Sequence, residues 1–218
     1  MKLVWSPETA SKAYIDTVKS CELIKESGVA EMVSAMAAGW NAKLVVETWS
    51  RGGSIATSIG LAVATHHTGG RHICIVPDEE SKTEYTQSMI QSGHSSDPEI
   101  LIGEPQEAVE GLEGIDFLVM DCRSDDFARI LRVVKLGQRG AVLICKNANS
   151  RAASDFRWRS VLDGKSRIVR SVFLPVGEGL DITHVGAAGG SSGKGKGGGR
   201  RWIKHIDHES GEEYVIRK

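Results

Sequence analysis

The sequence lacks long apolar runs and has little cysteine, and each shortage excludes a class of protein. Among its 218 residues there is no stretch of about 18 consecutive apolar residues, so we expect no transmembrane helix. The first residues, 1–7, lack the apolar core of a signal peptide. The four cysteines form no Cys-x-x-Cys pair, which indicates reduced thiols rather than disulfides or a zinc site. These shortages predict a cytoplasmic or nuclear protein, the nucleolus included.

An excess of charge of either sign is also missing. The 27 basic and 28 acidic residues leave a formal net charge of −1, which argues against a nucleic-acid binder driven by overall charge. The charges are not evenly spread, however. Residues 188–205 contain five Lys and Arg and no acidic residue, so the rest of the chain carries −6. An RNA partner is therefore still compatible with the sequence, provided that this basic segment holds it.

Glycine is abundant, with 25 residues, but eight of them lie in 186–199, where no side chain is bulky. Such a segment buries too little surface to offset its ordering entropy, so residues 188–200 are predicted to be a flexible linker. Residues 201–218 are predicted to form a strand-turn-strand tail. A basic, glycine-rich segment beside an aromatic residue suits RNA, although a plain solvated linker explains it as well. The residues that would contact RNA are Lys194, Lys196, Arg200, Arg201, Trp202 and Lys204.

Between residues 41 and 187, short runs rich in Val, Ile and Leu alternate with helical segments. Apolar runs without polar alternation are typical of parallel strands covered on both faces. The last two runs, 167–174 and 181–185, are too close for a helix between them, which predicts an antiparallel hairpin. We therefore predict an α/β fold: a doubly wound, mostly parallel, seven-stranded Rossmann-like sheet, with the helices of residues 1–40 packed on it. The expected helices include residues 8–25, 127–136 and 152–162.

In an open α/β sheet, ligands bind beyond the carboxyl ends of the strands, and here these ends carry polar residues and glycine. After the first strand, Gly52 and Gly53 let the backbone approach a ligand, and Ser54 is placed to cap the next helix. A tight turn explains that loop equally well. Asp78 and Glu79 suit either a ribose diol or an ordinary first helical turn. Asp121 ends an apolar strand and must be hydrogen-bonded, capping or ligating.

Four segments carry a family resemblance. The stretch from about residue 28 to 185 resembles the class I S-adenosylmethionine-dependent methyltransferases, especially the caffeoyl-CoA and catechol O-methyltransferase type. The whole chain is most similar to a plant family of unknown function built on this scaffold. The resemblance implies that S-adenosylmethionine, a nucleoside-type ligand, is bound near Glu47, Gly52, Gly53, Ser54 and Asp121. The family's ribose-binding acid has no clean match, and Asp78 or Glu79 is expected near the ribose from its position after a strand. The four segments are LVVETWSRGGS (44–54), IDFLVMD (115–121), GAVLICKN (140–147) and FLPVGEGL (173–180).

The departures from that family concern its chemistry. Trp49 stands where the family's first motif has glycine, and Ser124 stands where it has a lysine that serves as base. The resemblance implies metal ligands at Asp121 and Asn147, but Lys146 replaces the ligand between them, and a charged ammonium cannot bind Mg²⁺. Lys146 would instead pair with Asp121 or offset the charge that a metal would supply. We therefore expect no metal, and Asp121, Lys146 and Asn147 are the catalytic candidates.

Three functions stay open at this point. The first is a divergent or non-catalytic methyltransferase-like protein that retains a nucleoside-type pocket. The second is a non-enzymatic RNA-associated factor, for example in ribosomal RNA processing, that uses its basic tail. The third is an active methyltransferase that acts on a small or RNA acceptor without a divalent metal. The sequence does not indicate an oligomeric state.

Overall fold

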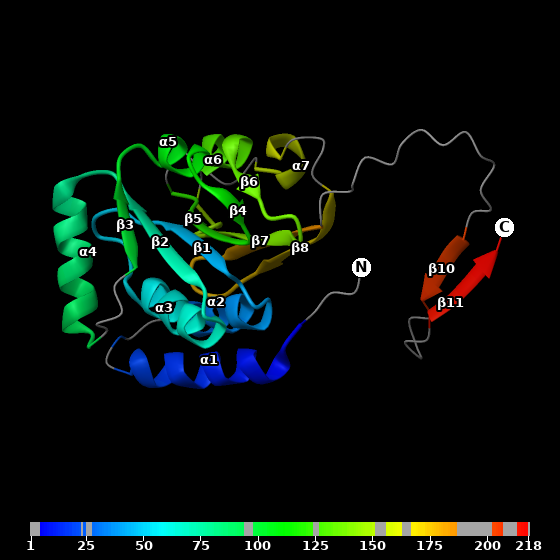
Figure 1. Cartoon of the computed structure of the whole chain (residues 1–218), viewed down its shortest axis with the longest axis horizontal. Helices are drawn as coiled ribbons and strands as arrows, with labels where there is room; N and C mark the ends of the chain where they lie inside the picture. The colour runs from blue at the N-terminus through cyan, green and yellow to red at the C-terminus, as the bar shows by residue number, and fades with distance from the viewer. Residues whose placement is uncertain are drawn as a thin grey trace. The chain divides into compact units, whose positions relative to one another are not determined.

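The chain folds into two separate units, residues 1–188 and 189–218. The structure, a computed structural model, describes residues 5–22, 24, 28–93, 98–123, 127–150, 156–162 and 167–186, and also the backbone of 202–206 and 213–217 (Figure 1). The predicted linker, residues 188–200, lies outside the described residues. The second unit is an antiparallel pair, β10 (Trp202–Ile206) and β11 (Glu213–Arg217), which forms a two-stranded sheet of its own.

The first unit is built on a seven-stranded sheet with the strand order β3-β2-β1-β5-β7-β9-β8. Strands β3, β2, β1, β5 and β7 are parallel, and β9 runs antiparallel to both β7 and β8. The predicted seven-stranded, mostly parallel sheet with a terminal hairpin is therefore confirmed. The strands are β1 (Leu44–Thr48), β2 (Arg71–Val76), β3 (Glu99–Ile102), β5 (Phe117–Asp121), β7 (Gly140–Lys146), β8 (Ile168–Leu174) and β9 (Leu180–Gly186).

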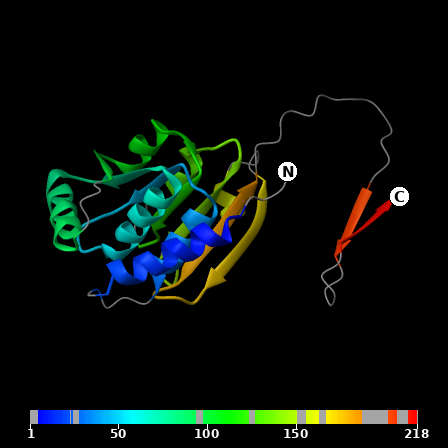
Figure 2. The same cartoon turned by 60° about the horizontal axis from the view of Figure 1, so that its bottom comes forward.

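Helices cover both faces of this sheet, as the apolar strands require (Figures 1 and 2). On one face, α5 (Pro105–Glu110), α6 (Phe127–Val133) and α7 (Trp158–Val161) pack on a core that includes Leu118, Met120 and Leu143. On the other face lie α2 (Val29–Gly39), α3 (Ala56–Thr68) and α4 (Glu79–Gln91). Helix α1 (Pro7–Ser20) packs on α2 and α3.

Helix α1 ends five residues earlier than the sequence pattern predicts. Ser6 caps its start by accepting a hydrogen bond from the Thr9 N–H, and proline follows at the first helical position. After Ser20 the chain turns, and the Ile24 N–H donates to the Cys21 carbonyl. Cys21 and Ile24, which extended the predicted helix, therefore lie beyond its end, and residues 23 and 25 lie outside the described residues.

Two other predicted helices also differ from the structure. Helix α6 ends at Val133, because Lys135 and Leu136 form strand β6, which pairs in parallel with β4 (Glu113–Ile115). Of the helix predicted over 152–162, residues 152–155 lie outside the described residues, and α7 begins at Trp158. Phe156 packs edge-on against Phe127, with ring centroids 4.9 Å apart, and Arg157 is extended.

The four cysteines all lie among the described residues, where each thiol is buried and forms no disulfide. The helices that the structure describes include none with the length and apolar character needed to cross a membrane.

Candidate functional site

A cavity of about 610 Å³ lies at the carboxyl edge of the sheet, where the loop after β1 faces the end of β7. Five parts of the chain meet there: the start of α2, the turn from β1 into α3, the turn after β5, the end of β7, and the β8–β9 turn. Among its lining residues are four that the sequence analysis singled out, Gly52, Ser54, Lys146 and Asn147. The other lining residues are Val29, Thr57, Arg123, Val176, Gly177, Glu178, Gly179 and Leu180.

The turn from β1 into α3 supplies one wall of the cavity. Gly52 adopts φ +71°, a conformation that favours glycine, and its N–H donates to the Glu84 carboxylate at 3.1 Å. Ser54 Oγ accepts from the Ala56 N–H at 3.2 Å, but the N-cap of α3 is Ile55 and not Ser54 as the sequence predicted. Trp49, which replaces the family's glycine, is buried, and its indole lies 3.1 Å from the position that a Cβ on Gly53 would take.

Asp121 ends β5 and is held by a local ion pair. The Arg123 guanidinium lies 2.7 Å from Asp121 Oδ2, and the Arg123 backbone N–H donates to Oδ1 at 2.9 Å. Burial by itself would raise the pKa of Asp121, but hydrogen bonds from Arg123 and Asn147 outweigh it and hold that pKa below its ordinary value. Asp121 is therefore an ionised, firmly oriented carboxylate rather than a proton acceptor poised near neutral pH.

Lys146 ends β7 beside Asp121 in the sheet register, yet its ammonium forms no ion pair within the part of the chain that the structure describes. The expected pairing of Lys146 with Asp121 is thus replaced by the Arg123–Asp121 pair. The side chain of Lys146 is buried, with 7% of the residue exposed, and it lines the cavity. Its positive charge helps to lower the pKa of both Asp121 and Glu47.

Two loops brace the opposite wall. The Ala148 and Asn149 N–H groups donate to the carbonyls of Gly179 and Glu178, each at 3.0 Å. Asn147 itself takes φ +59°, and Gly179 takes φ +88° at a position where an added Cβ would lie 3.0 Å from Phe173 and 3.1 Å from Asn149. These backbone bonds fix Asn147 on the cavity wall.

Glu47, which the resemblance assigns to the cofactor, lies in a closed cluster away from the cavity lining. Its carboxylate accepts from Tyr85 Oη at 2.9 Å and Ser58 Oγ at 3.0 Å, and His72 Nε2 lies 3.0 Å from Oε1. Burial alone would raise the pKa of Glu47, but His72, Lys146 and Ser58 together lower it. Burial and the Glu47 charge raise the pKa of Tyr85 well above its usual range.

Asp78 and Glu79 begin α4. Asp78 is the N-cap, and its carboxylate accepts from the Ser81 N–H at 2.7 Å, which lowers the pKa of Asp78. Neither residue is among those that line the carboxyl-edge cavity. Their place near the ribose stays a prediction. Glu47, Gly53 and Asp121 are also not among the residues that line the cavity, and their contacts with the cofactor stay predictions too.

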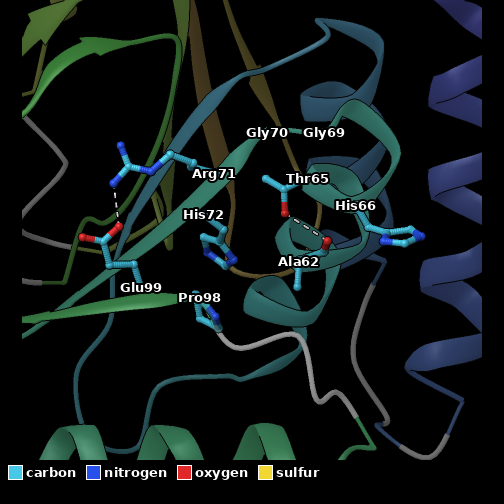
Figure 3. A pocket seen from close by; sticks show the side chains of 9 residues that line it. All are labelled: Ala62, Thr65, His66, Gly69, Gly70, Arg71, His72, Pro98 and Glu99. Atoms are coloured by element: carbon cyan, nitrogen blue, oxygen red, sulfur yellow. Dashed lines mark hydrogen bonds and ion pairs between the residues drawn. The ribbon is translucent and has the colours of Figure 1, made fainter.

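A second cavity, of about 520 Å³, lies at the opposite edge of the sheet, where β2 and β3 begin (Figure 3). Arg71 and Glu99 close an ion pair of 2.6 Å on one side, and Thr65 Oγ1 bonds to the Ala62 carbonyl. His72 also lines this cavity, with its Nδ1 buried and unpartnered among the described residues. Because ligands of open α/β sheets bind at carboxyl ends, the first cavity is the candidate site.

The residues around the cavity do not fit a divalent metal. The resemblance implies three ligand positions, 121, 146 and 147. The carboxylate of Asp121 is paired with Arg123, and position 146 is a lysine, whose ammonium cannot bind a cation. Among the described residues there is also no group of three or more His, Cys, Asp or Glu that could hold a metal ion. The expectation that no metal takes part stays a prediction consistent with this donor set.

Sequence reasoning missed Arg123, Thr57 and Glu178 at the cavity and His72 and Tyr85 around Glu47. Only the spacing of Arg123, two residues after Asp121 in a turn, was a usable signal. The others come from elements that the fold, and not the sequence order, brings together.

Comparison with solved structures defines the class of fold. A methyltransferase from Geobacter sulfurreducens is 21% identical with a TM-score of 0.56, over 83% of this chain and 90% of that one. A Staphylococcus aureus protein described as a caffeoyl-CoA O-methyltransferase is 15% identical with a TM-score of 0.58, over 79% and 92%. The O-methyltransferase TomG from Streptomyces achromogenes, in complex with SAM, is 19% identical with a TM-score of 0.53, over 85% and 92%.

At these identities the likeness establishes the fold, and the fold is that of the S-adenosylmethionine-dependent O-methyltransferases. The whole chain, residues 1–218, matches the family model described as "Protein of unknown function (DUF1442)", and the protein belongs to that family. No curated protein matches the sequence. That the family is a plant family stays a prediction.

Proposed function

We propose that the protein binds S-adenosylmethionine or its demethylated product in the carboxyl-edge cavity, as a divergent methyltransferase-like protein that uses no divalent metal. The observation that carries the proposal is the cavity itself. It lies where open α/β sheets bind ligands, and its volume is within the roughly 300–1,000 Å³ typical of small-molecule sites. The solved TomG structure of the same fold contains SAM, which supports the same choice of ligand.

The lining residues suit a nucleoside-type ligand with a charged amino-acid end. Gly52 allows close approach of the backbone, while Ser54 and Thr57 offer hydroxyl groups at the start of α3. Glu178 provides a negative charge for a cationic ligand group. When bound, S-adenosylmethionine supplies an activated methyl group.

The chain's own residues favour binding and positioning over proton transfer. Asp121 is ionised and tied to Arg123, and Ser124 replaces the lysine that serves as base in the resembled family. If an acceptor is methylated, the contribution of this site is to hold donor and acceptor in line. An active methyltransferase on a small or RNA acceptor would transfer labelled methyl groups from S-adenosylmethionine to that acceptor without added metal.

Isothermal titration with S-adenosylhomocysteine tests the proposal. We expect saturable binding to the full chain, and its loss in Ser54→Tyr, which fills the cavity. Ser11→Tyr, on the exposed face of α1, is the matched control and should bind like the wild type. If the wild-type chain gives no heat at millimolar ligand, the proposal is wrong.

A second candidate function rests on the uneven charge. Residues 188–205 carry +5 against −6 elsewhere, so an RNA-associated role would be located in this segment. Lys194, Lys196, Arg200 and Arg201 lie outside the described residues, and Trp202 and Lys204 lie on β10. The test is the affinity for a single-stranded RNA before and after deletion of residues 188–205. An affinity that the deletion does not change, or that does not fall with rising salt concentration, would exclude this role.

A further inference from the structure

The ammonium of Lys146 lies at the wall of the candidate cavity without a partner among the described residues. The residue as a whole is 7% exposed, and within the described chain its Nζ neither donates a hydrogen bond nor pairs with a carboxylate. Its Nζ is not fully buried, so its three donors are accessible from the cavity and favour a negatively charged partner there. Since Lys146 lines the cavity, its partner is expected there.

Lys146 lowers the pKa of two carboxylates, those of Asp121 and Glu47, but both form their hydrogen bonds with other residues. Asp121 is engaged by the Arg123 guanidinium at 2.7 Å and by the Arg123 backbone N–H. Glu47 accepts from Ser58 and Tyr85 and lies 3.0 Å from His72 Nε2. The positive charge of Lys146 lowers the pKa of both carboxylates, yet neither carboxylate forms an ion pair with Lys146.

The start of α3, where the helix dipole is positive, also faces the candidate cavity. Helix α3 has 13 residues, and Ser54 and Thr57 from its start line the cavity. The first N–H groups of a helix have no partner within it, and the helix dipole favours an anion there. Ser54 satisfies the Ala56 N–H, but Ile55, the N-cap, provides no side-chain acceptor.

We propose that Lys146 and the start of α3 form a binding site for an oxyanion, a carboxylate or a phenolate. Two ligands could supply this group: the amino-acid carboxylate of the proposed cofactor, or a separate small acid bound beside it. The first source rests on the proposed function, and the second does not. In either case Lys146 is a binding residue that pairs directly with the charged oxygen.

Isothermal titration of four ligands tests the oxyanion site. S-adenosylhomocysteine carries the amino-acid carboxylate, whereas 5′-methylthioadenosine lacks it; benzoate is an anion, whereas benzamide is its neutral counterpart of similar shape. Each is titrated into the wild type, Lys146→Met, Lys146→Arg, and Lys135→Met, an exposed lysine that serves as the control. Thermal melting confirms that each variant is folded.

We expect Lys146→Met to weaken at least one anion by about tenfold or more, which is the usual effect of losing one charge-assisted hydrogen bond. The neutral counterpart should change less than threefold, Lys146→Arg should keep most of the affinity, and Lys135→Met should match the wild type. A loss for S-adenosylhomocysteine identifies the cofactor carboxylate as the source. A loss for benzoate identifies a separate acid.

The proposal is overturned if Lys146→Met binds both anions as the wild type does, if the neutral ligands weaken equally, or if the wild type binds neither anion. Failure of the proposed function looks different. In that case neither S-adenosylhomocysteine nor 5′-methylthioadenosine binds the wild type, while benzoate still reports on Lys146.

Discussion

The buried carboxylate of Glu47 connects four elements of the fold. Through His72, Ser58 and Tyr85 it joins β1 to β2, α3 and α4, and it has no exposed surface. Hydrogen bonds to a buried charge stabilise a protein more than neutral ones, and their loss leaves the partners unsatisfied. Glu47 therefore stabilises the region beneath the candidate site.

Glu47→Ala should lower the free energy of unfolding by about 3 kcal/mol or more, because three buried polar groups lose their partner. Urea unfolding of the full chain measures the change. Glu79→Ala, at an exposed position in the first turn of α4, is the control and should shift stability by no more than about 0.5 kcal/mol. A loss below about 1 kcal/mol for Glu47→Ala would contradict the account.

Stability should also fall in acid. The pKa values of Glu47 and Asp121 are lower in the folded protein than their ordinary values, so the unfolded chain binds these protons more readily. Their stabilisation is complete above the ordinary values of about 4 and disappears as the pH falls through the folded pKa values. Urea unfolding between pH 7 and pH 3 measures this loss. The Glu47→Gln variant should show a shallower acid decline, and an identical decline would argue against Glu47 as a cause.

At the scale of elements, the cavity wall depends on the contact between the loop after β7 and the β8–β9 turn. Gly179 sits at that contact with φ +88°, and a Cβ there would approach Phe173 and Asn149 to 3.0 and 3.1 Å. A side chain at this position is therefore strained by its backbone and crowded by its neighbours.

Gly179→Ala should cost roughly 1–2 kcal/mol of stability and weaken S-adenosylhomocysteine binding, since the wall that carries Asn147 must shift. Gly111→Ala is the matched control, because Gly111 has φ −73° and a Cβ there would make only ordinary van der Waals contact, with the Ala108 carbonyl oxygen at 3.5 Å. Thermal unfolding and titration of both variants measure the difference. Equal behaviour of the two alanine variants would show that this contact does not support the site.

The elements also show what the sequence predicts well. Apolar runs such as 117–120 and 141–145 identify strands because a strand buried on both faces is predominantly apolar, and the gap before 181 is too short for a helix, which leaves a hairpin. Helix ends are predicted less well. The end of α1 coincides with a local turn at Cys21, and Phe156, before α7, packs against Phe127, which is distant in sequence.

The sequence predicted only those residues of the candidate site that local sequence marks. Gly52 and Ser54 lie in the loop after β1, and Asn147 directly follows β7, so local sequence marks them. The Arg123 pairing and the role of Glu178 depend on neighbouring loops that only the fold brings together. The burial of Glu47 depends on Tyr85, which is 38 residues away in sequence.

For the whole molecule, the division into two units predicts independent behaviour. Deleting residues 189–218 should leave the melting temperature of the first unit and its affinity for S-adenosylhomocysteine unchanged, because the units separate at residue 188. The same deletion should abolish any RNA binding that depends on the basic segment. A fall of more than about 5 °C in melting temperature would contradict this independence.

The most direct test of the central claim is a crystal structure of the full chain with S-adenosylhomocysteine at a saturating concentration. We expect the ligand in the carboxyl-edge cavity, in contact with Gly52 or Ser54 on one wall and with Asn147 on the other. A ligand bound anywhere else, including the cavity beside His72, or a cavity that stays empty in such crystals, would contradict it.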